Sequence, residues 1–248
     1  KASGDRAIAI GETNTSKVED TITMGASNTA NTGGGIAIGK NNAADSTASG
    51  GRASGNGQIA IGQDNSATNE DTIAIGRGTT ASGRLSTAIG RNADATGAGS
   101  IAIGSNGEPD SHGVAYRTTS NGLGAVAFGM GAGADGKAAL ALGGMSKATA
   151  DATTAVGYGA QASKVNALAL GKDAVASIKD GVALGSESKT TVDAGQVGYN
   201  PAAGRTNKYD NLTNNTDNVL TSNRAAVAIG DDDAHITRQL TGLAAGKK

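Results

Sequence analysis

The chain lacks cysteine and tryptophan, and it has only one phenylalanine, four tyrosines and two histidines among its 248 residues. Without cysteine, neither disulfide cross-links nor cysteine-ligated metals are available. With so few aromatic side chains, any core has to be thin and built from Ile, Val, Leu and Ala. Glycine, in contrast, accounts for 40 residues, roughly twice its usual share. This composition does not suit an ordinary globular domain.

A basic patch and a long apolar run are also missing. The net charge is −1, with the charged residues scattered along the chain, so nothing indicates nucleic acid or an anionic membrane as a partner. No apolar run reaches the ~18 residues that span a membrane. Because the chain begins in the middle of a repeat, we expect it to be a fragment of a longer protein.

What the sequence does contain is a repeat marked by glycine at every fourteenth position. The most regular stretch has marker glycines at Gly129, Gly143, Gly157, Gly171 and Gly185. Thirteen such glycines occur along the chain, and nine of the twelve intervals between them keep this period. A fixed short period is typical of a solenoid, in which each repeat forms one coil stacked on the next.

The residues before the marker glycines alternate large, small, large, except that Thr87 and Thr154 replace the first large residue, and the small one is Ala in every copy but Thr23. This alternation predicts a short β-strand with the large pair on one side, and we expect that pair, such as Ile103 or Leu142, to fill the coil interior. A second short strand is predicted five residues after the glycine, with a small inward residue. That residue is Ala30, Ala44, Ala67, Ala81, Ala95, Ala134, Ala148, Ala162 or Ala176. The predicted fold is an all-β solenoid of 14-residue coils that pair in parallel.

With the large pair inside, the Ala between them would form a stripe of methyl groups on the outside of the rod. Two large side chains bury too little apolar surface to order a whole coil, so we expect this stripe to pack against other chains. The alternative is that small residues only avoid a clash at a solvent face, which does not explain why Ser, Asn and Gly are absent there. The predicted seam consists of Ala102, Ala127, Ala141, Ala155, Ala169 and Ala183.

Three intervals exceed the period and divide the chain. We predict β-roll repeats over 1–185, with insertions at about 40–57 and 105–124, a longer insert over 186–224 and a last repeat motif at 225–230. Insertions in a solenoid form loops on its outside. In the tail, 231–248, Ile236, Leu240 and Leu243 are spaced by four and three residues, which predicts a short helix.

No catalytic, cofactor or metal site is expected. The stretch Gly131–Gly136 matches a dinucleotide-binding glycine motif, but no helical pattern follows it, and such matches arise by chance in a glycine-rich chain. The only histidines of the chain are His112 and His235, which lie far apart in the sequence. We therefore expect neither a histidine metal site nor a catalytic triad. The segment Asp231–Asp233 lacks the alternating ligand spacing of a calcium loop, so a solvated turn is expected there.

The segments Gly99-Ser-Ile-Ala-Ile-Gly104 and Asn166-Ala-Leu-Ala-Leu-Gly171, whose pattern recurs at the glycine period, resemble the head repeats of the YadA-like trimeric autotransporter adhesins. The segment Gly195–Pro201 resembles a known insert of such heads, and His235–Gly246 is similar to the neck that leads into a coiled-coil stalk. The resemblance implies a left-handed parallel β-roll, packed as a homotrimer about a threefold axis. Ile236, Leu240 and Leu243 would close the base of that trimer, and the stalk and outer-membrane anchor would follow Lys248.

The implied function is non-enzymatic attachment of a Gram-negative bacterium to host matrix proteins such as collagen, to host cells or to other bacteria, with a role in virulence. Binding would use either the repeat faces or the inserted loops, where Tyr116, Tyr199 and Tyr209 are candidate anchors. Three other classes stay open, and one of them is a purely structural β-solenoid. A solenoid enzyme would need a polar constellation, and none stands out from the repeat. An ice-binding solenoid would need regular threonine columns, whereas the Ser/Thr column six residues after the glycine has gaps.

Overall fold

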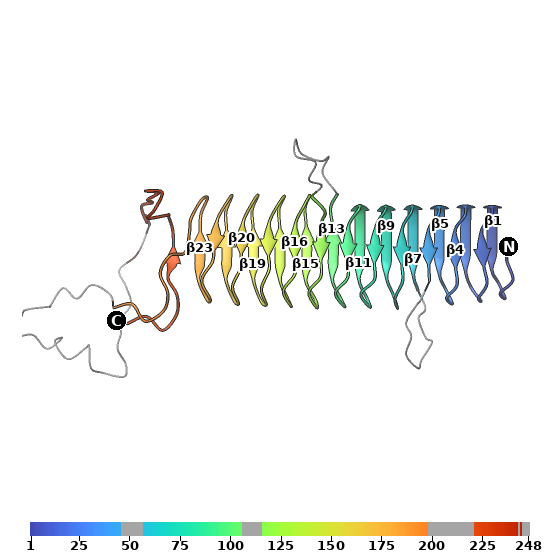
Figure 1. The fold of residues 1–248 in the computed structure, drawn as a ribbon, viewed down its shortest axis with the longest axis horizontal. Coiled ribbons are helices and arrows are strands. Elements are labelled where there is room, and N and C mark those ends of the chain that lie inside the picture. Colours follow the sequence, from blue (N-terminus) through green and yellow to red (C-terminus); the bar gives the residue numbers. More distant parts are fainter. Residues whose placement is uncertain (46–56, 106–115, 198–220, 243, 245–248) are drawn as a thin grey trace, which may run out of the picture.

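The structure, a computed structural model, describes residues 1–45, 57–105, 116–197, 221–242 and 244. These residues form a rod of stacked coils with two parallel sheets, and every coil except the last two contributes one strand to each sheet (Figure 1). No helix occurs among the described residues. The predicted all-β solenoid with parallel pairing is therefore confirmed.

The first sheet contains the strand that precedes each marker glycine. Its thirteen strands are β1 (Ile8–Glu12), β3 (Ile22–Ala26), β5 (Ile36–Lys40), β7 (Ile59–Gln63), β9 (Ile73–Arg77), β11 (Thr87–Arg91), β13 (Ile101–Ile103), β15 (Val126–Phe128), β17 (Leu140–Leu142), β19 (Thr154–Val156), β21 (Leu168–Leu170), β23 (Val182–Leu184) and β24 (Val227–Ala228).

The second sheet contains the shorter strand that follows each marker glycine. Its eleven strands are β2 (Thr15–Ser16), β4 (Thr29–Ala30), β6 (Ala43–Ala44), β8 (Ser66–Ala67), β10 (Thr80–Ala81), β12 (Asp94–Ala95), β14 (Thr119–Ser120), β16 (Gly133–Ala134), β18 (Lys147–Ala148), β20 (Gln161–Ala162) and β22 (Val175–Ala176). β14 lies inside the range 105–124 that was expected for the second insertion.

The repeat keeps its register where the sequence interrupts it. β5 pairs with β7 through Ile36 and Ile59, and β13 pairs with β15 through Ile101 and Val126. The same residues of the repeat therefore face each other in neighbouring coils along the whole first sheet. A column of equivalent residues runs along the rod for each position in the repeat.

The marker glycine is required by backbone geometry. Gly90 has a φ of 129°, which L-residues rarely adopt, and a Cβ placed there would lie 1.7 Å from the carbonyl oxygen of Gly104 in the next coil. Any side chain would therefore clash with the neighbouring backbone as well as strain its own. This double constraint explains why the glycine period is the clearest signal in the sequence.

The inside and outside of the first sheet are the reverse of the prediction. Ala102 and Ala141 are 0% exposed, whereas Leu142 is 41% and Phe128 50% exposed. The small residue of each large-small-large triplet points into the coil, and the large pair points out. The two sheets lie too close together for anything larger than a methyl group or a small polar side chain, apart from Gln58, which is also fully buried.

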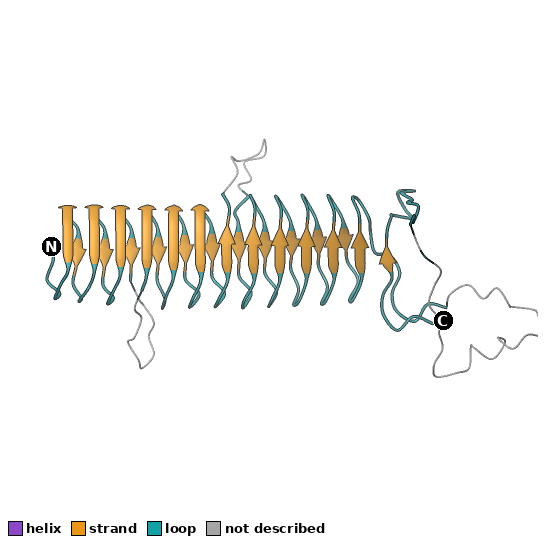
Figure 2. Cartoon of the chain, turned by 180° about the vertical axis from the view of Figure 1, so that it is seen from behind, coloured by secondary structure: helices purple, strands orange, loops and turns teal. Residues whose placement is uncertain are grey.

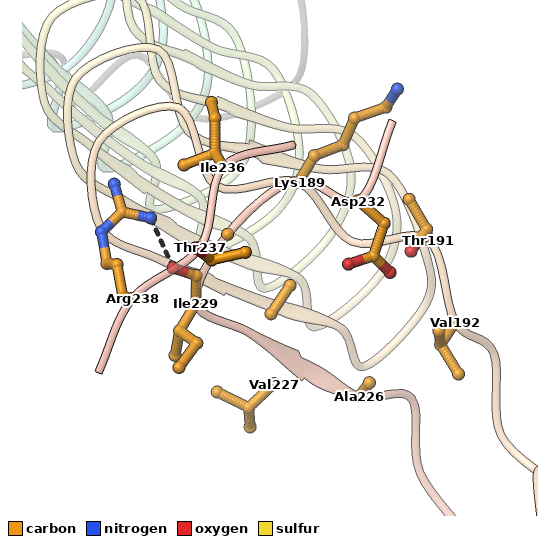
Figure 3. A pocket seen from close by; sticks show the side chains of 12 residues that line it. Lys189, Thr191, Val192, Ala226, Val227, Ile229, Asp232, Ile236, Thr237 and Arg238 are labelled. Atoms are coloured by element: carbon orange, nitrogen blue, oxygen red, sulfur yellow. Dashed lines mark hydrogen bonds between the residues drawn. The ribbon is translucent and has the colours of Figure 1, made fainter. Parts of the chain in front are cut away.

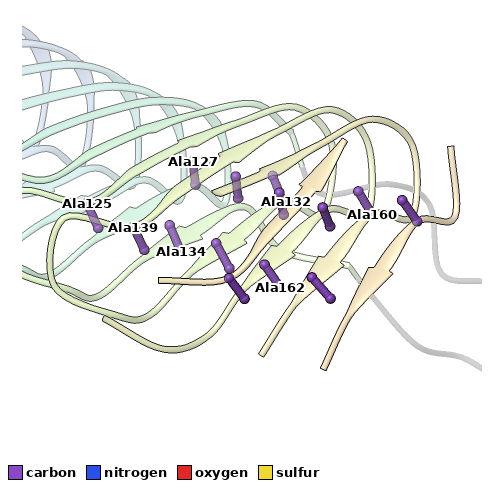
Figure 4. Packing of buried hydrophobic residues seen from close by; sticks show 14 of the residues in the cluster. Ala125, Ala127, Ala132, Ala134, Ala139, Ala160 and Ala162 are labelled. Atoms are coloured by element: carbon purple, nitrogen blue, oxygen red, sulfur yellow. The ribbon is translucent and has the colours of Figure 1, made fainter. Parts of the chain in front are cut away.

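The predicted alanine seam is therefore wrong, because all six of its residues are fully buried within their own chain. They are Ala102, Ala127, Ala141, Ala155, Ala169 and Ala183. Figure 4 shows alanines of both strands filling the space between the sheets. The predicted inward alanines of the second strand are confirmed as buried, but they face these alanines and not a large pair.

Buried asparagines replace alanine at one interior position in the N-terminal coils. Asn14, Asn28, Asn42 and Asn65 lie three residues after their marker glycines and form a ladder along the rod. The Nδ2 of Asn42 donates to Asn28 Oδ1 (2.9 Å), to the Ile38 carbonyl (3.0 Å) and to the Gly62 carbonyl of the next coil (2.8 Å). Its Oδ1 in turn accepts the backbone N–H and the Nδ2 of Asn65. A buried amide with so many partners stabilises the stack without an apolar core.

The turn after the first strand changes further along the rod, after two more coils beyond the last asparagine of the ladder. From β13 onward the first-sheet strands are three residues long or shorter instead of five, as Figure 2 shows. There the turn is closed by the backbone, with the Ser146 N–H bonded to the Gly143 carbonyl at 3.3 Å. The side-chain amide and the backbone N–H thus provide two ways to satisfy the same glycine carbonyls.

The packing predicts that Ala102→Leu destabilises the rod by about 1–3 kcal/mol or more, because the larger side chain overpacks the space between the sheets. The matched control is Ala98→Leu, an exposed alanine of the same coil, which should change stability by less than about 0.5 kcal/mol. Chemical denaturation of the two variants measures the difference. Equal losses would contradict the placement of Ala102 inside the coil.

The ladder predicts that Asn42→Asp costs at least about 2–4 kcal/mol, because it replaces a donor amide by a charged oxygen that faces three acceptors in the interior. The adjacent Asn41 is exposed and has a φ of 56°, so Asn41→Gly serves as the control and should be nearly neutral. Thermal unfolding of both variants is the measurement, and a stable Asn42→Asp protein would argue against the ladder.

Candidate functional site

The most extensive candidate surface is the outward face of the first sheet, which we call the apolar face. In most coils two large side chains project from it, one on each side of the buried small residue, and Thr87 and Thr154 replace one of the two in their coils. Its most exposed members are Ile8 (45%), Ile10 (55%), Met24 (39%), Ile101 (36%), Phe128 (50%), Leu142 (41%), Leu170 (39%), Leu184 (43%) and Val227 (61%). A soluble monomer rarely exposes so long a continuous apolar surface, which therefore marks an interaction site.

The outward face of the second sheet is polar and irregular. Its column includes Thr15, Thr29, Thr80, Asp94 and Lys147. Neighbouring threonines are paired only between β2 and β4, because Ala43, Ser66 and Asp94 interrupt the column. A flat threonine ladder, which an ice-binding solenoid would need, is not formed by the described strands of this sheet.

The candidate tyrosines are only partly described. Tyr116 is half-buried, and its Cβ lies close to Gly131, as does the sulfur atom of Met145. Tyr199 and Tyr209 lie outside the described residues. The sequence reasoning missed Tyr158, which is 56% exposed and follows the marker glycine directly. Its position in the repeat provides the signal, since Met130 and Lys172 occupy the same position and are exposed too.

Charged side chains collect at the two turns that flank each first-sheet strand, which we call the corners. At the C-terminal ends of the strands, Lys40, Arg77 and Arg91 share one column, with Gln63 between the first two. Asp64 lies beside this column. Its carboxylate accepts the Nδ2 of Asn41 at 2.9 Å and the Nε2 of Gln63 at 2.9 Å. These bonds, with weaker help from Arg77 and Lys40, lower the pKa of Asp64.

The corners at the N-terminal ends of the strands carry opposite charges stacked along the rod. Arg6 Nε donates to Asp20 Oδ1 at 2.5 Å between neighbouring coils, which lowers the pKa of Asp20. Arg84 pairs in the same way with Glu70. Exposed pairs of this kind contribute little to stability individually. Charged residues that already form such a pair within the chain are not free to pair with another molecule at this edge of the apolar face.

The tail is not helical in its described part, so the predicted helix at Ile236 and Leu240 is wrong. Ile236 forms an isolated antiparallel bridge with Asp231, and Leu240 is 65% exposed without regular structure. Leu243, the third residue of the predicted stripe, lies outside the described residues. A helix would need a partner for its apolar stripe, and a single chain provides none.

Arg238 holds the tail against the last regular coil. Its guanidinium donates to the carbonyls of Ser186 and Ile229 and, at 3.1 Å, to Ser188 Oγ. It thereby covers Gly185, where another coil would otherwise stack. A pocket of about 330 Å³ remains between this coil and the tail (Figure 3), with lining residues that include Lys189, Val192 and Ile236.

This end of the rod offers no metal site among the described residues. The Oδ1 of Asp231 accepts the backbone N–H groups of Asp233 and Ala234, and Asp233 pairs with Lys189 at 3.2 Å. The three aspartates therefore form a turn with an ion pair. No group of three or more His, Cys, Asp or Glu side chains that could hold a metal ion occurs in the described part of the chain.

No helix of the described residues is long and apolar enough to cross a membrane.

Comparison with known protein families gives one match. The family model described as YadA head domain repeat (2 copies) matches residues 2–22, 53–79, 81–106, 134–160 and 162–188, just over half of the chain. The matched stretches carry nine of the thirteen marker glycines and the part of the apolar face that belongs to those coils. A comparison with curated proteins gives no match.

Proposed function

The chain belongs to the YadA head domain repeat family, and on this basis we propose that it forms the head of a homotrimeric adhesin that attaches a Gram-negative bacterium to its surroundings. Members of this family are non-enzymatic, trimeric adhesins exposed on the outer membrane. The proposed targets are host extracellular matrix proteins such as collagen, host cells and other bacteria. A stalk and an outer-membrane anchor in the remainder of the protein are part of the proposal.

One observation supports the trimer most strongly, namely the apolar face that each chain leaves uncovered. Ile10, Phe128 and Leu142 are between 41% and 55% exposed in the single chain, and burying a residue of this size contributes about 1.5–3 kcal/mol. Three rods that place these faces around a common axis would bury all of them at once. The seam therefore consists of the large residues, in place of the alanines that sit inside the coil.

With the apolar faces at the axis, the second sheet and the outer turns form the exterior of the trimer. These surfaces are polar and repeat along the rod, so a ligand with repeating features can contact several coils and several chains together. Tyr116 and Tyr158 are the described aromatic candidates for anchoring a ligand, and Tyr158 would do so at the rim, where the exterior meets the seam between chains. Tyr199 and Tyr209 stay candidates on sequence grounds alone.

Leu142→Asp tests the trimer. The side chain points away from the interior, so the coil should still fold, but three carboxylates would meet in an apolar seam. We expect light scattering to give three times 24.0 kDa for the natural chain and a smaller mass for the variant at the same concentration. Thr149→Asp is the control, because Thr149 is exposed in the same coil. A monomeric natural chain would contradict the proposal.

Binding is tested with a panel of immobilised matrix proteins, host cells and bacterial cells. The natural chain should bind at least one of these surfaces, and Leu142→Asp should bind it at least tenfold more weakly, because avidity is lost with the trimer. The Thr149→Asp variant should bind as the natural chain does. Absence of binding to the whole panel would count against attachment as the function.

A further inference from the structure

The apolar face is bordered by two rows of corners, one at each end of its strands. In two individual coils, those of Gly76 and Gly129, the side chains at one corner are chemically complementary to those at the other. The strands of the first sheet run across the rod and stack along it (Figure 1). With a threefold axis parallel to the rod, equivalent strands of the three chains lie at one height and run head to tail around a triangle. The corner at the C-terminal end of each strand then meets the N-terminal corner of the neighbouring chain, in the same coil.

In the coil of Gly76 these two corners carry opposite charges. Asp71 lies five residues before the glycine and Arg77 one residue after it, at the two ends of β9, and both are exposed. No hydrogen bond or ion pair joins either side chain to another part of the chain that the structure describes. Arg77 is only near Asp64, whose own carboxylate is held by Asn41 and Gln63. Each is therefore free to pair across a chain boundary.

In the coil of Gly129 the two corners are both apolar. Leu123 is 59% exposed and Met130 is 44% exposed, at opposite ends of β15. Together with Val126 and Phe128 they extend the apolar face across the whole width of the coil. In a single chain these two side chains lie on opposite edges of the sheet, and only another chain can bring such edges together.

The charges at the two corners can be compared in the same way for every described coil. Five residues before and one residue after the marker glycine, both positions are charged in only two described coils, and the signs are opposite in both: Asp71 with Arg77, and Arg6 with Glu12. The next coil after that of Gly76 has Leu85 and Arg91 at its corners, which neither match nor repel. No described coil carries two like charges at these two positions, but Arg6 is already held by Asp20. Six residues before the glycine, where Leu123 lies, Arg84 shares its coil with Arg91 and Asp5 shares its coil with Glu12. The free charge match is therefore specific to the coil of Gly76.

From these corners we infer that Asp71–Arg77 and Leu123–Met130 are contacts between chains that set the axial register of the proposed trimer. The apolar face repeats at every coil, so chains displaced by one coil, about 4.8 Å, would still bury similar apolar surface. The corners do not repeat in this way. A one-coil displacement separates Leu123 from Met130 in either direction. It places Arg77 against Leu85 in one direction and Asp71 against Arg91 in the other, so the apolar contact is the one that disfavours both staggered assemblies. The inference rests on the proposed trimer.

The absence of cysteine makes disulfide trapping a direct test. In Leu123→Cys/Met130→Cys, the two thiols of one chain are separated by a strand and its corners, well beyond the ~7 Å between Cα atoms that a disulfide bridges. If equivalent coils of the three chains lie at the same level along the axis, oxidation should therefore form disulfides between chains and give covalent trimers. The control Met130→Cys/Asp151→Cys pairs corners two coils apart, about 10 Å along the rod, and should remain monomeric in denaturing electrophoresis.

Light scattering of the same samples separates the possible failures. A trimer without cross-links in the matched pair, or with equal cross-linking in the control, would overturn the register inference and leave the trimer standing. A monomer would overturn both the trimer and the inference. Covalent trimers of the matched pair alone are the result we expect.

A charge exchange tests the second contact independently. Arg77→Asp should weaken trimer association roughly tenfold, because three exposed pairs are lost in each trimer and two aspartates then meet at every corner. Adding Asp71→Arg should restore most of the affinity. Arginine is tolerated at this corner, since Arg6 occupies the equivalent position with a φ of 55°. An additive loss in the double variant would contradict the contact.

Discussion

The close approach of the two sheets is the constraint on which the rest of the structure depends. All buried apolar residues that the structure describes are alanines, because the interior accommodates little more than a methyl group. Such a core stabilises the chain weakly, so the backbone pairing between coils and the buried polar ladder become correspondingly important. The same constraint excludes the large residues from the interior and places them on the outside, where a single chain leaves them uncovered.

The periodicity of the sequence was sufficient to predict the architecture. Glycine at every fourteenth position reports a backbone conformation and a contact between coils that no side chain permits, as Gly90 illustrates. That signal is local, so it gives the strand positions and the register directly. The two strands per coil, their parallel pairing and the inward alanines of the second strand could be predicted for this reason.

Which face of the first strand points into the coil could not be predicted in the same way, because the alternation of large and small residues shows only that the two faces differ. It does not show which of them is the interior. Ordinary experience places Leu142 inside and Ala141 outside, and here the sheet separation reverses that order. The asparagines are the sequence feature that indicates a narrow polar interior, since Asn14, Asn28 and Asn42 recur at the glycine period within a thin coil.

The conformation of the tail could not be predicted for a different reason. The spacing of Ile236 and Leu240 predicts a helix, yet the described tail residues are irregular and lie against the last coil through Arg238. Helical spacing expresses a tendency that requires a partner surface, and the single chain offers none. The candidate ligand site is limited in a similar way. Tyr158 could have been found from its place in the repeat, but nothing in the sequence ranks it above its neighbours.

The central claim is that the large residues of the first sheet are outside the coil and buried between chains. Thiol labelling tests it most directly, because the natural chain has no cysteine. Val156→Cys and Ser163→Cys lie in one coil, the first on the apolar face and the second on an exposed turn. With a bulky maleimide under reducing conditions, the account predicts fast labelling at Ser163 and protection at Val156 until the assembly dissociates. Fast labelling of Val156→Cys in the intact protein would contradict it.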